Sequence, residues 1–165
     1  MAEPLPRPLS ARAAHRLELL EVLTLGAPFC GFKLVAGLVL ASRAGSLRML
    51  GFALVALGAL DALINLANLA GLLWKRARPL PACTFSLVFS LRARPGTALR
   101  AKWIDLGNSL DVLLSFSLVA LMIGCGELRG LPAPRALAWN VCVILNVLGA
   151  GAARFGASLR DLREP

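Results

Sequence analysis

Four long apolar runs divide this chain, and they constrain its fold more than any other feature. They extend over residues 17–42, 47–74, 103–125 and 136–157. About 20 helical residues are enough to cross a hydrocarbon core roughly 30 Å thick, and each run is longer than that. Hydrophobic residues make up 58% of the sequence, above the roughly 45–50% that is typical of soluble domains. The sequence therefore predicts an all-α, polytopic membrane protein with a four-helix transmembrane bundle.

The distribution of Lys and Arg predicts the orientation. Of eighteen basic residues, thirteen fall in segment 1–16, in loop 75–102 or near the carboxyl end, four fall in the other two loops, and Lys33 lies inside a span. Cytoplasmic loops carry the excess of Lys and Arg. We therefore expect both termini in the cytoplasm, with a basic segment 1–16, a membrane domain 17–157 and a tail 158–165.

The first apolar run also resembles a signal peptide in its basic start. However, Glu18, Glu21 and Lys33 interrupt the apolar core that such a peptide needs, so we expect an uncleaved span. The abundance of Arg, Ala, Leu and Gly favours a high-GC bacterial genome. The expected location is the bacterial inner (plasma) membrane.

Loop 75–102 is the only sizeable segment outside the spans. It contains no acidic residue, and in residues 82–91 apolar and smaller side chains alternate with period two, which predicts an extended segment or one lying at the interface. Thr97 follows a Pro-Gly turn and is an expected N-cap for the helix that enters the third span. The basic residues are suited to anionic lipid, each contributing on the order of 1 kcal/mol, and a cytosolic docking partner is the alternative.

Several functional classes are disfavoured by the residues present. The net charge of +9 is spread between apolar runs rather than gathered with aromatics, so we expect no nucleic-acid binding. His15 is the single histidine, which leaves no histidine-based metal site or catalytic triad within one chain. The four cysteines show no Cys-x-x-Cys pairing. The sequence predicts no catalytic residue, metal or cofactor, and an enzyme is the less favoured class.

Polar side chains inside the spans carry the functional hypothesis, because ionisable groups at membrane depth normally face protein or water. The candidate ion or substrate pathway consists of Asp61, Asn65, Asn68, Asn108 and Asp111, with Asp105 and Glu21 at its inner mouth. Asp61, Asn65 and Asn68 fall within about 60° of one another on a helix, and the polar residues of the third span cover a wider arc of about 120°. Because the second and third spans are consecutive and antiparallel, we expect these faces to look at each other.

Lys33 is the one Lys within a span. Measured along its helix it lies at nearly the depth of Asp61, so we expect these two side chains to pair, with Lys33 as a counter-ion or gate. Arg154 lies close to the inner surface, where its side chain could reach Glu21 or Asp105 or extend to the cytoplasm. The acids outnumber the bases in the spans, which favours protons or cations over anions.

The leading hypothesis is a small inner-membrane transport protein or channel for protons or small cations. A homo-oligomer is expected, because four short helices enclose little room for a conduit. The alternative is a non-catalytic membrane subunit or scaffold, whose polar faces pack against partner helices and whose basic loop binds anionic lipid or a cytosolic partner. A third possibility is an intramembrane enzyme with a divalent metal on Asp105 and Asp111, although these carboxylates lie about 120° apart on a helix.

The topology is directly testable. Reporter fusions at the carboxyl end and within residues 75–102 should be active only in the cytoplasm, because the basic residues there resist translocation. A carboxyl end found outside would show that the number of spans is wrong.

Overall fold

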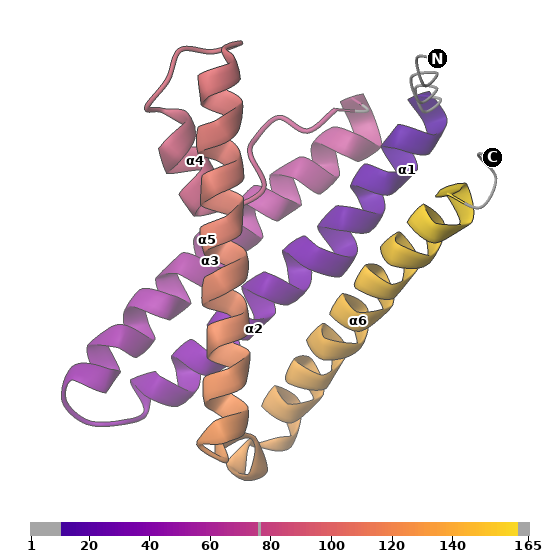
Figure 1. The fold of residues 1–165 in the computed structure, drawn as a ribbon. Coiled ribbons are helices and arrows are strands. Elements are labelled where there is room, and N and C mark those ends of the chain that lie inside the picture. Colours follow the sequence, from indigo (N-terminus) through magenta and orange to yellow (C-terminus); the bar gives the residue numbers. More distant parts are fainter. Residues whose placement is uncertain (1–10, 76, 162–165) are drawn as a thin grey trace.

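The computed structural model describes residues 11–75 and 77–161, and side chains within 15–75, 77–149 and 151. The described chain is all-α (Figure 1). Its helices are α1 (Ala11–Glu21), α2 (Ala27–Ala41), α3 (Ser46–Lys75), α4 (Thr84–Ser90), α5 (Ala98–Gly124) and α6 (Ala133–Asp161). A π-turn, η1 (Val22–Gly26), joins α1 to α2, and a 3-10 turn, η2 (Glu127–Gly130), precedes α6.

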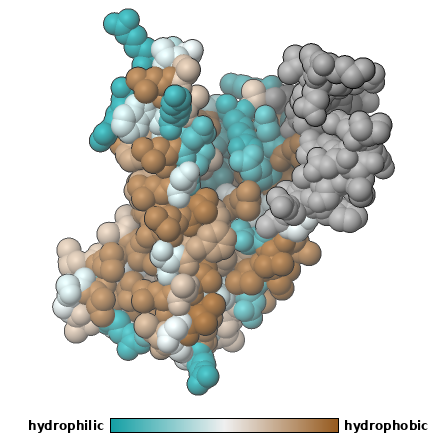
Figure 2. All heavy atoms as spheres, viewed as in Figure 1, coloured by the Kyte–Doolittle hydropathy of each residue, from teal (hydrophilic) through white to brown (hydrophobic). Residues whose placement is uncertain are grey.

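Three helical segments are long and apolar enough to cross a membrane: His15–Ala41, Ser46–Lys75 and Ala98–Gly124. The apolar described part of α6, Ala133–Gly149, is shorter. Large apolar side chains such as Leu63, Leu66 and Leu113 are exposed, as lipid-facing side chains are, and apolar residues cover much of the visible surface (Figure 2). These features identify an integral membrane protein.

The helices share one polar end. The first described turn of α1, the end of α3, the start of α5 and the end of α6 lie at the same end of the molecule, and the α2–α3 and α5–α6 connections lie at the other (Figure 1). At that second end, Arg43 donates to Glu127 at 2.6 Å, which joins the two connections.

The main apolar core lies toward this second end. It is built by α2, α3, α5 and α6 around Phe32, with Phe29, Val35, Ala36, Val39, Leu54, Leu118, Met122 and Trp139. The rings of Phe32 and Trp139 lie 5.1 Å apart between centroids. Packed apolar side chains therefore fill the half of the molecule that is farther from the polar end.

The rod formed by α1, η1 and α2 is continuous but irregular. Pro28 lies at the start of α2, and proline removes one backbone donor and crowds the carbonyl four residues earlier. The π-turn η1 lies just before Pro28 and accommodates the missing donor and the crowded carbonyl. Such turns are frequent at functional sites.

The prediction of an extended segment at residues 82–91 is wrong, because Thr84–Ser90 form α4. The alternating pattern also contains Ser86 and Ser90, four residues apart and both buried, which is a helical spacing. Cys83 and Ser86 cap the first turn reciprocally, which initiates the helix. The predicted N-cap Thr97 is confirmed, since its side chain accepts from the backbone N–H of Arg100 at 3.2 Å.

Gly107 allows α4 to pack closely on α5. A Cβ at this position would lie 2.5 Å from the backbone of Ser86, and backbone atoms cannot yield as a side chain can. We expect Gly107→Ala to lower the free energy of unfolding by about 1–3 kcal/mol through overpacking. The measurement is denaturant unfolding in detergent micelles.

Gly124 provides the matched control on the same helix. No atom lies within 4 Å of a Cβ built there, so Gly124→Ala should leave stability equal or slightly higher. Equal effects of the two substitutions would contradict the close packing of α4 on α5.

Candidate functional site

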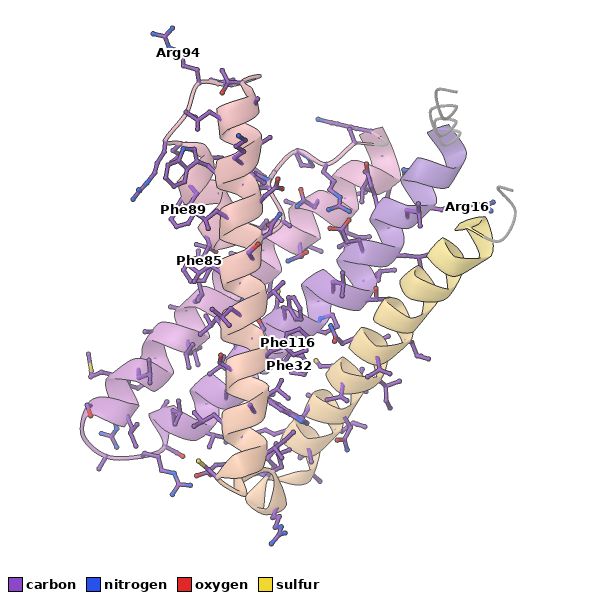
Figure 3. All side chains as sticks on the ribbon, viewed as in Figure 1. Arg16, Phe32, Phe85, Phe89, Arg94 and Phe116 are labelled. Carbon is purple, nitrogen blue, oxygen red and sulfur yellow. The ribbon has the colours of Figure 1, made fainter. Side chains whose placement is uncertain are left out.

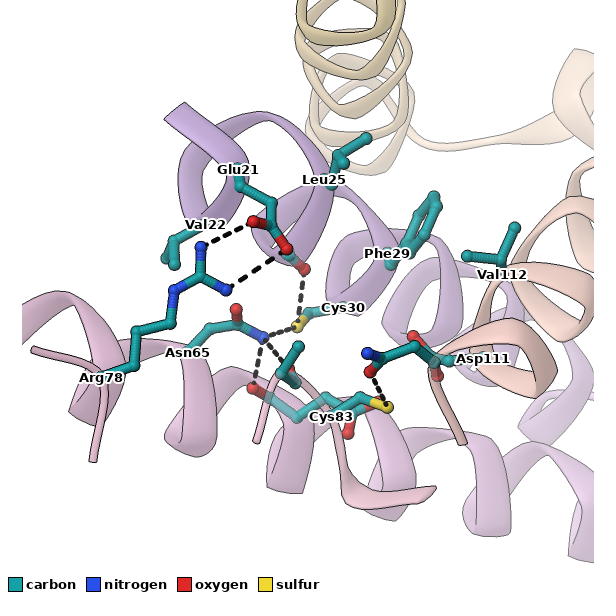
Figure 4. Close-up of a pocket in the computed structure, with 14 residues that line it drawn as sticks. Glu21, Val22, Leu25, Phe29, Cys30, Asn65, Arg78, Cys83, Asp111 and Val112 are labelled. Atoms are coloured by element: carbon teal, nitrogen blue, oxygen red, sulfur yellow. Dashed lines mark hydrogen bonds and ion pairs between the residues drawn. The ribbon is translucent and has the colours of Figure 1, made fainter. Parts of the chain in front are cut away.

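A pocket of about 120 Å³ opens at the polar end, between the α1–α2 rod, α3, α5 and the segment before α4 (Figure 4). Its mouth has Glu21 and Arg78, and its deep end has Asp61 and Asp111. The other lining residues are Val22, Leu25, Gly26, Phe29, Cys30, Asn65, Ala82, Cys83, Asn108 and Val112. Hydrophilic residues gather at the same end of the molecule (Figure 2).

A buried charge cluster lies at the deep end of the pocket. The Lys33 ammonium donates to Asp61 Oδ2 at 2.5 Å and to Asp111 Oδ1. All three residues are buried, Lys33 completely so. Two carboxylates therefore share one ammonium, and the cluster carries a surplus of one negative charge when all three are ionised.

The helix packing brings these three side chains together. Helix α2 packs against both α3 and α5, so Lys33 lies between the two helices that supply the acids. A Cβ at Gly58 of α3 would lie 3.1 Å from Lys33 Cβ, which shows how closely α2 and α3 approach there. The polar faces of α3 and α5 converge, but Lys33 and the start of α4 lie between them.

The segment from Ala77 to Cys83 turns back along α3 instead of continuing away from the end of that helix (Figure 1). Asn68 binds this segment through both polar atoms of its side-chain amide. Its Oδ1 accepts from Leu80 N at 3.0 Å, and its Nδ2 donates to Pro81 O at 3.2 Å. Farther along, Thr84 N donates to Asp61 Oδ1 at 2.6 Å. Asp61 lies roughly 20 Å from the end of α3 at ~1.5 Å per residue, so the chain re-enters to about that depth.

This re-entrant segment explains why Asp61, Asn65 and Asn68 form a polar stripe along one side of α3. Non-helical backbone at membrane depth has no water to satisfy it, so its donors and acceptors need partners in the protein. Asn65 Nδ2 donates to Asp61 O at 2.9 Å and to Ala82 O at 3.4 Å. Pro79 and Pro81 have no backbone N–H to satisfy. The stripe thus positions the segment that forms one wall of the pocket.

An ion pair crosses the pocket mouth. Arg78 donates to Glu21 Oε2 at 2.7 Å and to the backbone oxygen of Glu18 at 3.0 Å. Arg78 comes from the re-entrant segment and the acids from α1, so this pair ties the segment to the first helix. Glu21 is half-exposed, and the pair therefore lies at the boundary with solvent.

Two thiols line the pocket. Cys30 Sγ accepts from Asn65 Nδ2 at 3.5 Å, and Cys83 Sγ lies 2.9 Å from Ser86 Oγ. Among the described residues, no three His, Cys, Asp or Glu side chains are arranged to hold a metal ion.

The structure brings most of the predicted site residues together. Glu21, Asp61, Asn65, Asn108 and Asp111 line the pocket, and Lys33 pairs with Asp61 as predicted.

Two predicted site residues lie elsewhere. Asn68 is buried against the re-entrant backbone, and Asp105 is exposed on α5 outside the pocket lining. Asp105 and Asp111 therefore do not share a metal site. Glu21 pairs with Arg78, and the side chain of Arg154, its predicted partner, lies outside the described residues.

Sequence reasoning missed Arg78, both pocket thiols and the second carboxylate on Lys33. The spacing of residues gives no signal for a loop that returns into the membrane. A signal for Arg78 did exist: Glu18 and Glu21 stand at the inner end of the first span, and loop 75–102 contains bases but no acid. The same excess of acids in the spans indicated that Lys33 had more than one possible partner.

No family model matches this chain, and searches of curated proteins and of solved structures found no match. The functional argument therefore depends on the geometry of the pocket and its charge cluster.

The charge cluster generates a stability prediction. Lys33→Met should destabilise the protein by about 3–5 kcal/mol, because it leaves two buried carboxylates without their cation. Adding Asp61→Asn and Asp111→Asn together should recover much of this loss, and adding either alone should recover less. Denaturant unfolding in detergent of all eight combinations of these three substitutions, wild type included, measures this coupling.

Additive effects would contradict a shared ammonium. Full recovery with Asp61→Asn alone would show that Asp111 does not depend on Lys33. The amide keeps the size and most of the hydrogen bonding of each carboxylate, so the comparison isolates charge.

Proposed function

We propose that this chain is a small membrane transport protein for protons or small monovalent cations. The observation that carries the proposal is a pocket, open at the polar end, whose deep end is a buried cluster of two carboxylates and one ammonium. Structural ion pairs at membrane depth are normally balanced in charge, because an unbalanced charge is costly to hold there. A surplus carboxylate that can be reached from solvent is instead suited to bind and release a positive charge.

The apolar core supports a gated mechanism over an open pore. Phe32, Leu118 and Met122 belong to the core that lies between the cluster and the second end. An ion held at Asp111 therefore has access from one side only, and its passage requires a change of conformation, as in a carrier or a closed channel. The ammonium of Lys33 competes with the ion for the same carboxylates, which is the expected behaviour of a counter-ion or gate.

The proposed topology has four spans, counting α6, with both termini in the cytoplasm of a bacterial inner membrane. The support is the excess of Lys and Arg in the segments at the polar end and the common location of the described ends of α1 and α6 (Figure 1). The pocket would then open toward the cytoplasm. We also propose a homo-oligomer, since four helices enclose only a small pocket.

Anionic lipid is the proposed partner of the hairpin made by α4 and the start of α5. Arg94 points away from the helices at its tip (Figure 3). The Arg92 guanidinium lies 5.4 Å from the ring centroids of both Phe89 and Trp103, as expected of aromatic and basic side chains at a headgroup boundary.

The rival function is a non-catalytic subunit or scaffold. One observation favours it: Asn65 and Asn68 form hydrogen bonds with the backbone of the re-entrant segment, which is a packing role. Within the transport proposal the same bonds position the pocket wall, so flux is the property that separates the two functions.

Flux from purified protein in liposomes tests the proposal. We expect uptake of protons or monovalent cations that is lost in Asp111→Asn and in Asp61→Asn, because the amide removes the surplus charge. Folding should be retained, since a neutral amide is less costly to bury than a carboxylate. A pH-sensitive dye and a cation-sensitive dye inside the vesicles give the measurement.

Glu127→Gln is the matched control, because it removes one acidic charge at the end opposite the pocket and should leave flux unchanged. Wild-type vesicles as tight as empty ones, across pH, membrane potential and the common cations, would favour the subunit function.

A further inference from the structure

We infer that the pocket binds a small organic ammonium ion, a monocation with a short apolar body. This inference rests on the proposed function in one respect, namely that the ligand reaches the Asp61–Lys33–Asp111 cluster from water. It goes further by naming the chemical class of the ligand.

The charge of the pocket selects a monocation. At the mouth, Arg78 pairs with Glu21 at 2.7 Å and lies 3.8 Å from a carboxylate oxygen of Glu18, and both acids are exposed to solvent, which screens their charge. At the deep end, Lys33 balances only one of the two carboxylates, Asp61 and Asp111. One negative charge therefore remains at the buried end, where attraction for an opposite charge is strongest because the surroundings are least polar.

The walls select an organic cation over a bare metal ion. Val22, Leu25, Phe29 and Val112 give the pocket an apolar side. The side-chain oxygens in the lining other than the carboxylates are the amide oxygens of Asn65 and Asn108, and Asn108 Oδ1 already accepts from Ser86 at 2.8 Å. No group of three or more His, Cys, Asp or Glu side chains that could hold a metal ion occurs among the described residues. A desolvated alkali ion would meet carbon on this side, whereas an alkyl chain would fit there.

The ammonium group has suitable acceptors. Asp61 and Asp111 each offer lone pairs beyond those used by Lys33, because an ionised carboxylate has about four acceptor positions. The ring of Phe29 also lines the pocket, and an aromatic face attracts a cation. A few placed polar groups within a largely apolar wall are typical of small-molecule sites.

The volume limits the ligand. A pocket of about 120 Å³ has room for about four water-sized groups at ~30 Å³ each. A primary amine with three carbons has four non-hydrogen atoms and matches this space. A longer chain would have to extend through the mouth, past Arg78 and Glu21.

Calorimetric titration of the purified full-length protein in detergent tests the inference with three probes at constant ionic strength: n-propylammonium chloride, propan-1-ol and sodium chloride. We expect saturable binding of n-propylammonium, with at least tenfold weaker binding of the neutral alcohol and of sodium. Asp111→Asn should weaken n-propylammonium binding at least tenfold, and Glu127→Gln should leave it unchanged.

A second variant keeps the test decisive if Asp111→Asn alters the fold. Val112→Trp enlarges a side chain at the exposed edge of the pocket and leaves every charge in place. It should abolish n-propylammonium binding while thermal unfolding stays at the wild-type temperature. Undiminished binding in Val112→Trp would overturn the location of the site.

The other outcomes separate this inference from the transport proposal. Equal binding of n-propylammonium and propan-1-ol, or of n-propylammonium and sodium, would overturn the ligand class. Proton or cation flux without any amine binding would sink this inference and leave transport standing. Specific amine binding by a protein that shows no flux of protons, of the common cations or of n-propylammonium itself would support the site and remove the transport function.

Discussion

The pairing of Lys33 with two carboxylates is the interaction on which the arrangement of the helices depends. A fully buried ammonium at membrane depth is costly unless it is paired and hydrogen-bonded. Lys33 obtains its partners from two different helices, Asp61 on α3 and Asp111 on α5. The position of α2 between α3 and α5 satisfies this requirement, and α5 accordingly packs on α2 and α4. A helix order that separated these three side chains would leave charges alone in an apolar core.

The same cluster determines where the re-entrant segment ends. Asp61 uses one oxygen for Lys33 and the other for the backbone N–H of Thr84, so the first turn of α4 is tied to the cluster. Between α3 and α4, Asn68 accepts a hydrogen bond from the backbone N–H of Leu80, and Asn65 donates one to the backbone oxygen of Ala82. The polar residues of α3 thus serve two purposes at different heights: the amides hold the irregular backbone, and the carboxylate joins that backbone to the charge cluster.

The helices could be predicted from the sequence because their cause is local. Apolar runs of membrane-spanning length define α2, α3 and α5 whatever their neighbours are, and helical depth alone was enough to pair Lys33 with Asp61. The extended conformation predicted for residues 82–91 is wrong because their sequence fits two patterns at once. Apolar side chains alternate with period two, as in a strand, and Ser86 and Ser90 are four residues apart, as on one face of a helix. The decision between them depends on the cap at Cys83 and on contact with Gly107, a residue 24 positions away from it along the chain.

The sequence predicted the acidic residues of the site but not Arg78 or the two thiols, and the reason is related. A carboxylate inside a span is conspicuous by itself, whereas Arg78 resembles every other Arg in a basic loop. Its role depends on the loop turning back over α1 to meet Glu21. A return of this kind has no periodic signature, because its hydrogen bonds come from side chains on another helix.

The two halves of the bundle differ in a way that constrains any movement of an ion through it. Toward the polar end, the helices are joined around the pocket by ion pairs of Lys33 and Arg78 and by amide hydrogen bonds to the re-entrant segment. Toward the other end they are joined by close-packed apolar side chains around Phe32. The backbone irregularity, η1, lies on the polar side, between Glu21 at the mouth and Lys33 at the cluster. A π-turn followed by proline is where a helix bends most readily. Bending there would displace α1 and the mouth while α2 kept its place in the apolar core. Access from the polar end could therefore change without any repacking of that core, whereas access from the other end would require the core itself to open.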